Sequence, residues 1–214
     1  MKQLQSNFTN MVLSTTVVTL FAAAVLGPVY TATKEPIAQA KEQKKQQAIT
    51  DVLPAHTRIA EAQEIGECTL YDAYNNDTFV GAAVESSTDG FGGQVKIMTG
   101  FDATGKIQNY SVIEQAETPG LGVKMIDWFK TDKNHQNILG KNPETDNLTV
   151  TKDGGSVDAI TAATISSRAF LMAVNKAYAA FVDKHANANS STTAQTDSAH
   201  AATPADTTTI NVQP

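Results

Sequence analysis

The sequence predicts an α+β fold, in which an antiparallel sheet is packed with helices and preceded by one N-terminal transmembrane helix. Three observations support this class. A long uncharged run stands near the N-terminus, several extended runs separated by turn-forming residues follow, and an amphipathic helical pattern covers residues 167–184. Because strands joined by short turns pair antiparallel, we expect one sheet whose apolar face is covered by the last helix.

Length and composition allow one folded core. The chain has 214 residues, of which 41% are hydrophobic, and this suits a single core of ordinary size. We predict a membrane anchor over residues 1–33, a polar linker or membrane-proximal helix over 34–49, a folded domain over 50–185 and a tail over 186–214. The tail is rich in Ala, Ser and Thr and should be disordered, because it has little apolar surface to bury.

Net charge and cysteine content exclude several functions. The formal net charge is -6 and no basic stripe is visible, so nucleic acid is not an expected partner. The single cysteine, Cys68, cannot form an internal disulfide; we expect a buried small side chain, with a reactive thiol as the alternative. The histidines show no ligand spacing and no catalytic triad motif stands out, so neither a metal site nor a catalytic residue is predicted.

The uncharged N-terminal run is long enough to cross a membrane. No charged side chain occurs between Lys2 and Lys34, and a helix of the 20 residues 11–30 would be about 30 Å long, as thick as a bilayer core. A cleaved signal peptide is the alternative, because small residues follow Tyr30. The apolar region of such a peptide has about 7–15 residues, however, so a retained anchor is favoured.

The lysines around this run bear on its orientation. Lys34, Lys41, Lys44 and Lys45 follow the run, whereas only Lys2 precedes it. The positive-inside rule alone would therefore place the C-terminal domain in the cytoplasm.

The first half of the domain has the pattern of an antiparallel sheet. Four extended runs are predicted strands: residues 69–74, 79–84, 94–101 and 106–113. The turn residues Asn75-Asn-Asp-Thr78 between the first two runs are typical of a β-hairpin, and Asp102-Ala-Thr-Gly105 makes a second tight turn. Run 94–101 alternates, so that Val95, Ile97 and Thr99 share one face.

The second half of the domain contains a loop and two helices. Residues 117–122 form a loop because of their Pro and Gly content, and residues 123–129 have the apolar spacing of a short helix. In this helix we expect Ile126, Trp128 and Phe129 to pack into the core. The last helix, predicted over 167–184, has apolar residues at helical spacing: Phe170, Val174, Ala177, Tyr178 and Phe181.

The stretch Asp158-Ala-Ile-Thr-Ala-Ala-Thr-Ile-Ser-Ser167 carries more hydroxyl groups than a helix start requires. Asp158 or Thr161 would suffice as the cap, so ordinary capping is one interpretation. It leaves the small pair Ala162-Ala163 beside Thr164 unexplained. A helix N-terminus with small neighbours and clustered hydroxyls also suits a phosphate group, because free N–H groups and the helix dipole favour an anion there.

The same stretch resembles the flavinylation motif of the FMN-binding domain found in the G subunit of the Rnf electron-transport complex and in the C subunit of the sodium-translocating NADH:quinone reductase. That motif reads Asp, two residues, Ser/Thr-Gly-Ala-Thr, one residue and Ser/Thr, and the threonine after its alanine is linked to FMN through a phosphoester. The turn at 90–93, the hairpin through 105 and the loop 117–122 are also similar to the family, as is the N-terminal apolar run. The folded region 50–185 would thus be an FMN-binding domain.

The resemblance implies a set of cofactor-binding residues. Thr164 would carry the FMN phosphoester, and Thr161 would help to hold the phosphate at the helix end beside Ala163. The residues implied near the isoalloxazine ring belong to one loop, in which glycine allows close backbone approach: Glu117, Thr118, Gly120, Leu121 and Gly122.

Two further residues are singled out by their positions relative to these motifs. Ala162 stands where the family usually has Gly. If that position needs a positive φ, the Cβ of Ala162 costs free energy and could slow or block the modification. Lys124 directly follows the loop and is a candidate for stabilising the reduced, anionic flavin.

The resemblance implies a membrane-anchored subunit of an ion-translocating oxidoreductase complex of the ferredoxin:NAD or a related type, in which covalent FMN relays electrons between other subunits. The implied partners are those subunits, a flavin transferase and the lipid bilayer. The resemblance also implies that the domain lies on the extracytoplasmic side of a bacterial inner membrane. This is the opposite of the side that the positive-inside rule gives from the lysines after the apolar run. Two alternatives are an extracytoplasmic assembly module without flavin, which Ala162 favours, and a flavinylated relay of another extracytoplasmic reductase.

Overall fold

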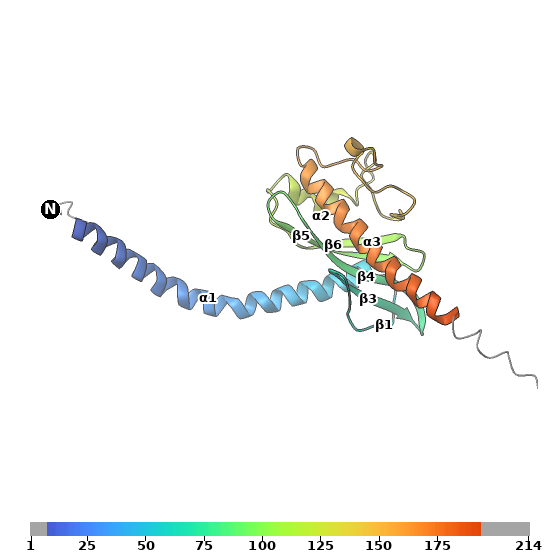
Figure 1. Cartoon of the computed structure of the whole chain (residues 1–214), viewed down its shortest axis with the longest axis horizontal. Coiled ribbons are helices and arrows are strands. Elements are labelled where there is room, and N and C mark those ends of the chain that lie inside the picture. Colours follow the sequence, from blue (N-terminus) through green and yellow to red (C-terminus); the bar gives the residue numbers. More distant parts are fainter. Residues whose placement is uncertain (1–7, 194–214) are drawn as a thin grey trace, which may run out of the picture. The chain divides into compact units, whose positions relative to one another are not determined.

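The computed structural model describes residues 8–193 and divides the chain into two compact units, with the boundary between Asp51 and Val52. Helix α1 (Phe8–Val52) forms the described part of the first unit except for its last residue, Val52, which belongs to the second (Figure 1). Within the described residues it is the one helix long and apolar enough to cross a membrane. Residues 34–49, predicted as a linker or a helix, are helical within α1.

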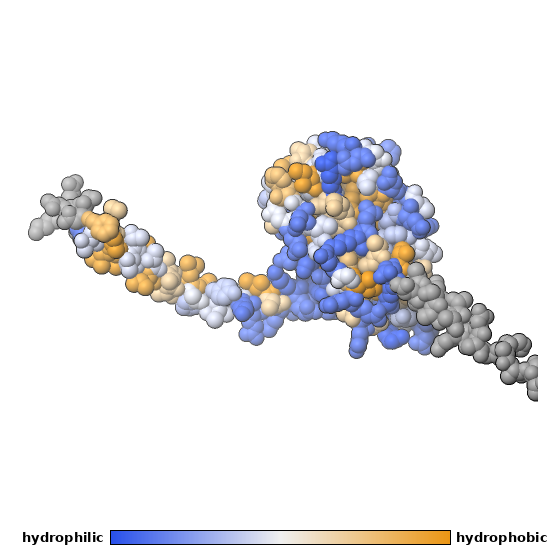
Figure 2. All heavy atoms as spheres, viewed as in Figure 1, coloured by the Kyte–Doolittle hydropathy of each residue, from blue (hydrophilic) through white to orange (hydrophobic). Residues whose placement is uncertain are grey.

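The apolar part of α1 is suited to a hydrocarbon environment. Its large apolar side chains are exposed, as Figure 2 shows along the first half of the helix. The hydroxyls of Thr15, Thr16 and Thr19 donate to main-chain carbonyls one turn earlier in the same helix, at 2.8–2.9 Å. Polar groups that are satisfied inside the helix do not need water, which a bilayer core does not supply.

The second unit is built on a six-stranded antiparallel sheet, which confirms the predicted α+β class. The strand order is β1-β3-β4-β5-β6, and β2 pairs with β3 outside this path. The strands are β1 (Arg58–Ile59), β2 (Gln63–Ile65), β3 (Cys68–Asn75), β4 (Thr78–Asp89), β5 (Gln94–Asp102) and β6 (Ile107–Glu114).

The long helix α3 (Thr164–Thr193) covers one face of this sheet and packs on β3, β4 and β5 (Figure 1). Its Phe170 stacks on Phe129 at 4.4 Å between ring centroids and meets Tyr110 edge-on at 4.8 Å. The remaining elements are short: η1 (Gly122–Lys124), α2 (Met125–Trp128) and η2 (Thr151–Asp153). They lie in the segment between β6 and α3, which also supplies most of the site described below.

The predicted hairpin between residues 69–74 and 79–84 is confirmed. Strands β3 and β4 are joined through Asn76 and Asp77, whose φ angles are 46° and 65°. Two consecutive residues with positive φ form the turn that matches the twist of a hairpin, and Asn and Asp tolerate this conformation better than most residues.

Strand β4 is longer than predicted and continues to Asp89 instead of ending at Val84. Its polar end, with Ser86 and Thr88, lies beyond the predicted strand. The structure turns both hydroxyls toward α3, where they donate to the carbonyls of Ala173 and Ala169 at 2.8 and 2.7 Å. The strand is therefore stabilised by contacts with a helix about 80 residues away in sequence. The short strands β1 and β2 were not predicted either.

Three predictions about the helices need correction. Residues 123–129 form a 3₁₀ turn followed by one turn of α-helix, and of the three residues expected in the core only Phe129 is buried: Ile126 is 42% exposed and Trp128 is half-buried. Helix α3 begins at Thr164 instead of Ser167 and continues to Thr193, past the predicted start of the tail. The rest of the predicted tail lies outside the described residues.

A buried ion cluster holds the far end of α3 to the sheet. Asp72 on β3 is 4% exposed, accepts a short hydrogen bond from Lys184 Nζ, and has His185 Nε2 at 3.5 Å from its other carboxylate oxygen. Burial alone would raise the pKa of the Asp72 carboxyl, but hydrogen bonding and charge from His185 and Lys184 outweigh it, so this pKa lies below its usual value.

We expect Asp72→Asn to lower the free energy of unfolding at neutral pH by about 3 kcal/mol, because it leaves Lys184 without its buried partner. The folded-state pKa of Asp72 is depressed. Its contribution is therefore complete above the unfolded-state pKa of about 3.9 and is lost as the pH falls through the folded-state value. Urea unfolding of the full-length protein across this pH range should show the difference between wild type and variant shrinking in acid.

The matched control is Asp77→Asn, since Asp77 has a side chain 95% exposed and lies 3.8 Å from an exposed arginine. This variant should change stability by less than about 0.5 kcal/mol. An Asp72→Asn effect as small as that of Asp77→Asn, or one that is independent of pH, would contradict the role given to the cluster.

Candidate functional site

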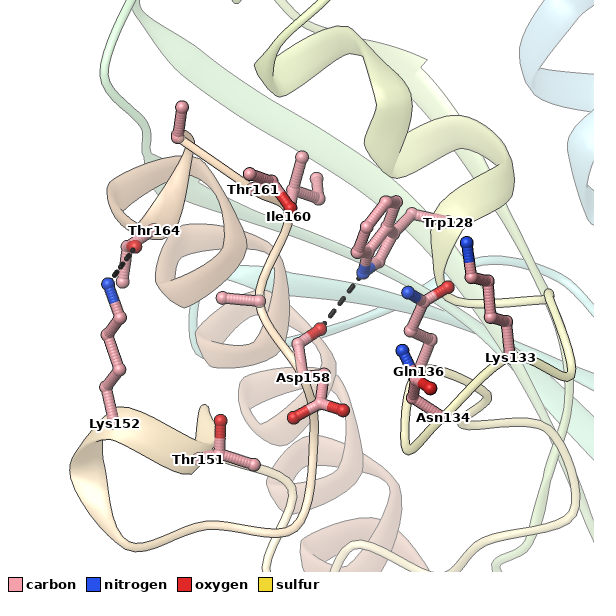
Figure 3. A pocket seen from close by; sticks show the side chains of 12 residues that line it. Trp128, Lys133, Asn134, Gln136, Thr151, Lys152, Asp158, Ile160, Thr161 and Thr164 are labelled. Atoms are coloured by element: carbon pink, nitrogen blue, oxygen red, sulfur yellow. Dashed lines mark hydrogen bonds between the residues drawn. The ribbon is translucent and has the colours of Figure 1, made fainter.

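Thr164, the first residue of α3, lies at the junction of two cavities. The first, here called the polar cavity, has a volume of about 430 Å³ and lies between residues 128–136, η2 and segment 158–164 (Figure 3). The second, here called the apolar cavity, has a volume of about 390 Å³ and lies between Phe91, loop 117–122 and residues 162–166. Thr164 lines both and is partly exposed.

The polar cavity presents cationic and hydrogen-bonding groups to Thr164. Lys152 Nζ donates to Thr164 Oγ1 at 3.5 Å, and Figure 3 shows its side chain extending from η2 toward the start of α3. Thr161, Lys133 and the half-buried Trp128 also line this cavity. An anionic group at Thr164 would thus face a lysine and the N-terminus of a long helix, both of which favour negative charge.

The apolar cavity is wide and open at its rim. Phe91, Leu121 and Ile165 line it and remain 68%, 38% and 52% exposed. Thr118 and Ala163 complete its lining near Thr164. An exposed cluster of large apolar side chains around a concave surface is typical of a binding site for a flat apolar group.

The clustered hydroxyls at the start of α3 have separate structural roles. Ser167 Oγ donates to the carbonyl of Ala163 and accepts from the N–H of Ile160, at 3.0 and 2.9 Å, and so closes the turn that enters the helix. Ser166 Oγ donates to Glu117 Oε2 at 2.7 Å. Both serines are buried. Ser166 also lines the apolar cavity, but its hydroxyl is held by Glu117, and Thr164 is the one of the three that lines both cavities.

Glu117 joins three segments of the site. Its carboxylate is buried and accepts from the backbone N–H groups of Phe91 and Gly92, at 2.7 and 3.2 Å, as well as from Ser166. The resemblance places Glu117 near the isoalloxazine ring, and it does line the apolar cavity. The geometry identifies it as a positioning residue that fixes the walls of this cavity.

The two glycines of loop 117–122 serve different purposes. Gly120 has φ +76°, a left-handed conformation that glycine adopts without strain, and a Cβ there would meet nothing within 4 Å. At Gly122 a Cβ would stand 2.6 Å from both Glu117 Oε2 and Ser166 Oγ. Gly120 therefore shapes the turn without lining either cavity, whereas Gly122 allows the close approach of the loop to α3.

Several residues lie elsewhere than the sequence indicated. Lys124 is exposed on η1 and lines neither cavity, so Lys152 is the lysine beside Thr164. Asp158 does not cap α3, because its Oδ2 accepts from the N–H of His135 at 3.2 Å. Trp128, expected in the core, lines the polar cavity and donates from Nε1 to the Asp158 carbonyl at 3.0 Å.

The sequence did not predict Lys152 as a site residue, because this lysine lies in a short 3₁₀ turn without a periodic pattern of apolar residues. The available signal was the sequence Thr151-Lys-Asp-Gly-Gly155, a turn-forming stretch shortly before the hydroxyl-rich motif.

As for metals, no group of three His, Cys, Asp or Glu side chains within residues 8–193 could hold an ion.

Fold and site together define a domain that follows a helix long and apolar enough to cross a membrane and that presents a threonine hydroxyl between a cationic and an apolar surface. Residues 90–179 of the chain match the family model described as the FMN-binding domain. This range includes the turn before β5, loop 117–122, both cavities and most of α3. The match confirms the FMN-binding domain expected from the motifs.

The relatives have one name in common. The chain is 34% identical over 189 residues to the G subunit of the ion-translocating oxidoreductase complex of Aliivibrio fischeri (strain ATCC 700601 / ES114), covering 79% of this chain and 89% of that protein. It is 32% identical over 177 residues to the G subunit of the same complex of Escherichia coli (strain K12), covering 74% of this chain and 84% of that protein. The chain therefore belongs to the family of G subunits of ion-translocating oxidoreductase complexes, with an FMN-binding domain.

Ala162 is the strained position of the site. Its φ is +63°, in the left-handed region, where the Cβ of an L-residue is crowded by its own backbone. The sequence suggested this conformation from the family's preference for glycine. Ala162 lies in the turn directly before α3, where the N–H of Ala163 donates to the Ile160 carbonyl at 3.0 Å.

We expect Ala162→Gly to raise the free energy of unfolding by about 0.5–1 kcal/mol, because relief of left-handed strain exceeds the added flexibility of the unfolded chain. Urea unfolding of the full-length protein measures this change. Ala103→Gly is the matched control, since Ala103 is an exposed turn residue outside the positive-φ set; it should be neutral or destabilising. Equal effects of the two substitutions would refute strain at Ala162.

Proposed function

We propose that this protein is the membrane-anchored electron-transfer subunit of an Rnf-type ion-translocating complex, and that it carries FMN in phosphoester linkage to Thr164. The observation that carries the proposal is the position of the Thr164 hydroxyl, which faces a cationic cavity on one side and an apolar cavity on the other. The flavinylation motif gives the same residue as the attachment site.

The residues present fit the two ends of FMN. Lys152 and Thr161 would hold the phosphate from the polar cavity, where charge-assisted hydrogen bonds are available. Thr118, Leu121 and Ala163 would contact the isoalloxazine ring from the apolar cavity, with Glu117 and Gly122 fixing the loop behind them. Bound FMN supplies reversible electron transfer at its ring, and the protein supplies attachment, orientation and the local charge.

A covalent tether suits a relay. The linkage replaces the hydrogen of the Thr164 hydroxyl by the phosphoryl group of FMN, so that free FMN and free chain together lose one water. A carrier that passes electrons between other subunits does not need to exchange its cofactor, and the open rim at Phe91 and Ile165 would leave the ring accessible to partners. The partners we propose are other subunits of a ferredoxin:NAD-type complex and, during maturation, a flavin transferase.

Ala162 supports a second candidate function. Where the family's motif has glycine, this chain holds alanine in a left-handed conformation. A transferase that needs the bare glycine would leave Thr164 unmodified. The domain would then serve as a membrane-tethered module for assembly of the complex.

The domain would lie on the extracytoplasmic side of the bacterial inner membrane. The resemblance to the family favours this side, where the flavin transferase also acts. The four lysines that follow the apolar run oppose it. They are spread over a dozen positions of α1, and contacts with other subunits can fix the orientation of a single helix.

The attachment site is tested by the intact mass of the protein purified from its own host, followed by peptide mapping across residues 158–168. We expect an added FMN residue, less water, on Thr164 and its complete loss in Thr164→Ala. Thr78→Ala is the control, because it removes the hydroxyl of an exposed threonine that lines neither cavity and should keep the covalent flavin. Unmodified wild-type chains in active membranes would instead support the assembly module.

The orientation is tested by fusing alkaline phosphatase, which is active only outside the cytoplasm, to the C-terminus. We expect high phosphatase activity from the full-length fusion and a loss of at least about tenfold when residues 1–33 are deleted, since the apolar run is then absent. A fluorescent protein that folds only in the cytoplasm serves as the reciprocal reporter. Activity of that reporter alone would place the domain in the cytoplasm.

A further inference from the structure

We propose that the polar cavity is a preformed phosphate site, in which Lys152 is the counter-ion of the phosphate carried by Thr164 and Gln136 is a second ligand. This inference rests on the proposed function, because it requires a phosphoester at Thr164. It adds an assignment to two residues outside the motif: one comes from the 3₁₀ turn η2 and the other from the loop after α2.

Lys152 is placed for this role by distance and by the lack of a competing partner. Its Nζ lies 3.5 Å from Thr164 Oγ1, on the cavity side of the helix start (Figure 3). Within residues 8–193 no carboxylate lies in ion-pair contact with Lys152, although the next residue is an aspartate. The charge of Lys152 is therefore available to a ligand, and a charge-assisted hydrogen bond to phosphate is stronger than one to a neutral hydroxyl.

The neighbouring aspartate fixes the turn that carries Lys152. Arg168 in the first turns of α3 donates from Nε and Nη2 to the two carboxylate oxygens of Asp153, both at 2.7 Å. The Thr151 N–H also donates to the Val157 carbonyl at 2.8 Å. The paired contact clamps η2 to the helix that bears Thr164, so Lys152 and Thr164 are held at the same edge of the cavity. Two-point Arg–carboxylate contacts have defined geometry, which suits such positioning.

Gln136 is the independent observation that a ligand belongs in this cavity. It is only 3% exposed, and it lines the cavity with its side chain turned inward (Figure 3). The backbone N–H of Gln136 donates to the Lys133 carbonyl at 3.3 Å, whereas its side-chain amide opens onto the cavity and is not among the fully enclosed, unpartnered side-chain atoms of residues 8–193. An amide that is held in the protein interior but opens onto a cavity has hydrogen-bonding capacity left for a ligand or for water.

The charge balance of the cavity favours an anion over a cation. Lys133 and Lys152 both line it, whereas the one acidic residue in its lining, Asp158, has its carboxylate engaged by His135, which donates its N–H at 3.2 Å and has ring Nδ1 at 3.6 Å. The N-terminus of α3 adds partial positive charge. Lysine, amide and helix N-terminus together form the donor set that phosphate oxygens require.

The proposal is tested on full-length protein co-produced with its flavin transferase, by comparing wild type with Lys152→Met and with Lys124→Met. Lys124 is an exposed lysine outside both cavities, so its loss controls for net charge. Two quantities are measured: the covalently flavinylated fraction by intact mass, and the ³¹P chemical shift of the phosphoester. Thermal unfolding checks that each variant is folded.

We expect Lys152→Met to slow flavinylation about tenfold and to move the ³¹P resonance of the modified fraction, while Lys124→Met matches wild type in both. Gln136→Leu should move the same resonance. An unchanged resonance in Lys152→Met would overturn the proposal whatever the yield. If Lys152→Met has no modified fraction, Lys152→Arg must restore it; otherwise the proposal is overturned. If the wild-type chain carries no covalent flavin, the proposed function itself is refuted. That result differs from one in which the chain is modified but its flavinylation and ³¹P resonance do not depend on Lys152.

Discussion

The geometry of the site depends on one buried carboxylate, that of Glu117. Because its two oxygens accept from the turn at 90–93 and from Ser166, three segments far apart in sequence form a single wall around the apolar cavity. A buried carboxylate is stable only when it is well hydrogen-bonded, and here three donors satisfy it. The close approach that these bonds require also explains why Gly122 has no room for a Cβ.

The start of α3 has a division of roles among its hydroxyl residues. Ser167 closes the turn through Ile160 and Ala163, Ser166 holds Glu117 at the wall of the apolar cavity, and Thr164 is the one of these that lines both cavities. A single capping residue could not provide all three contacts, since one hydroxyl donates a single hydrogen bond. The hydroxyl residues beyond those needed for a cap are therefore explained by the packing of the loop and by the placement of the Thr164 hydroxyl between the two cavities.

The two cavities differ in the chemistry they offer at a shared edge. One combines Lys152 with a helix N-terminus, and the other is lined largely by apolar side chains such as Leu121 and Ile165. This contrast matches a cofactor with an anionic end and a flat apolar end. The strained Ala162 lies at the same edge and lines both cavities. Strain at that residue is thus connected directly to the orientation of Thr164.

The apolar N-terminal helix, the hairpins and the apolar face of α3 could be predicted without a structure, because they follow from local composition and from periods of two and 3.6 residues. The sequence also singled out Thr164 and loop 117–122. Three features became visible in the folded chain alone: Ser86 and Thr88 extend β4, Trp128 lines a cavity, and Lys152 is the lysine beside Thr164. These outcomes depend on partners brought together from distant parts of the chain by folding, and such contacts leave no period in the local sequence.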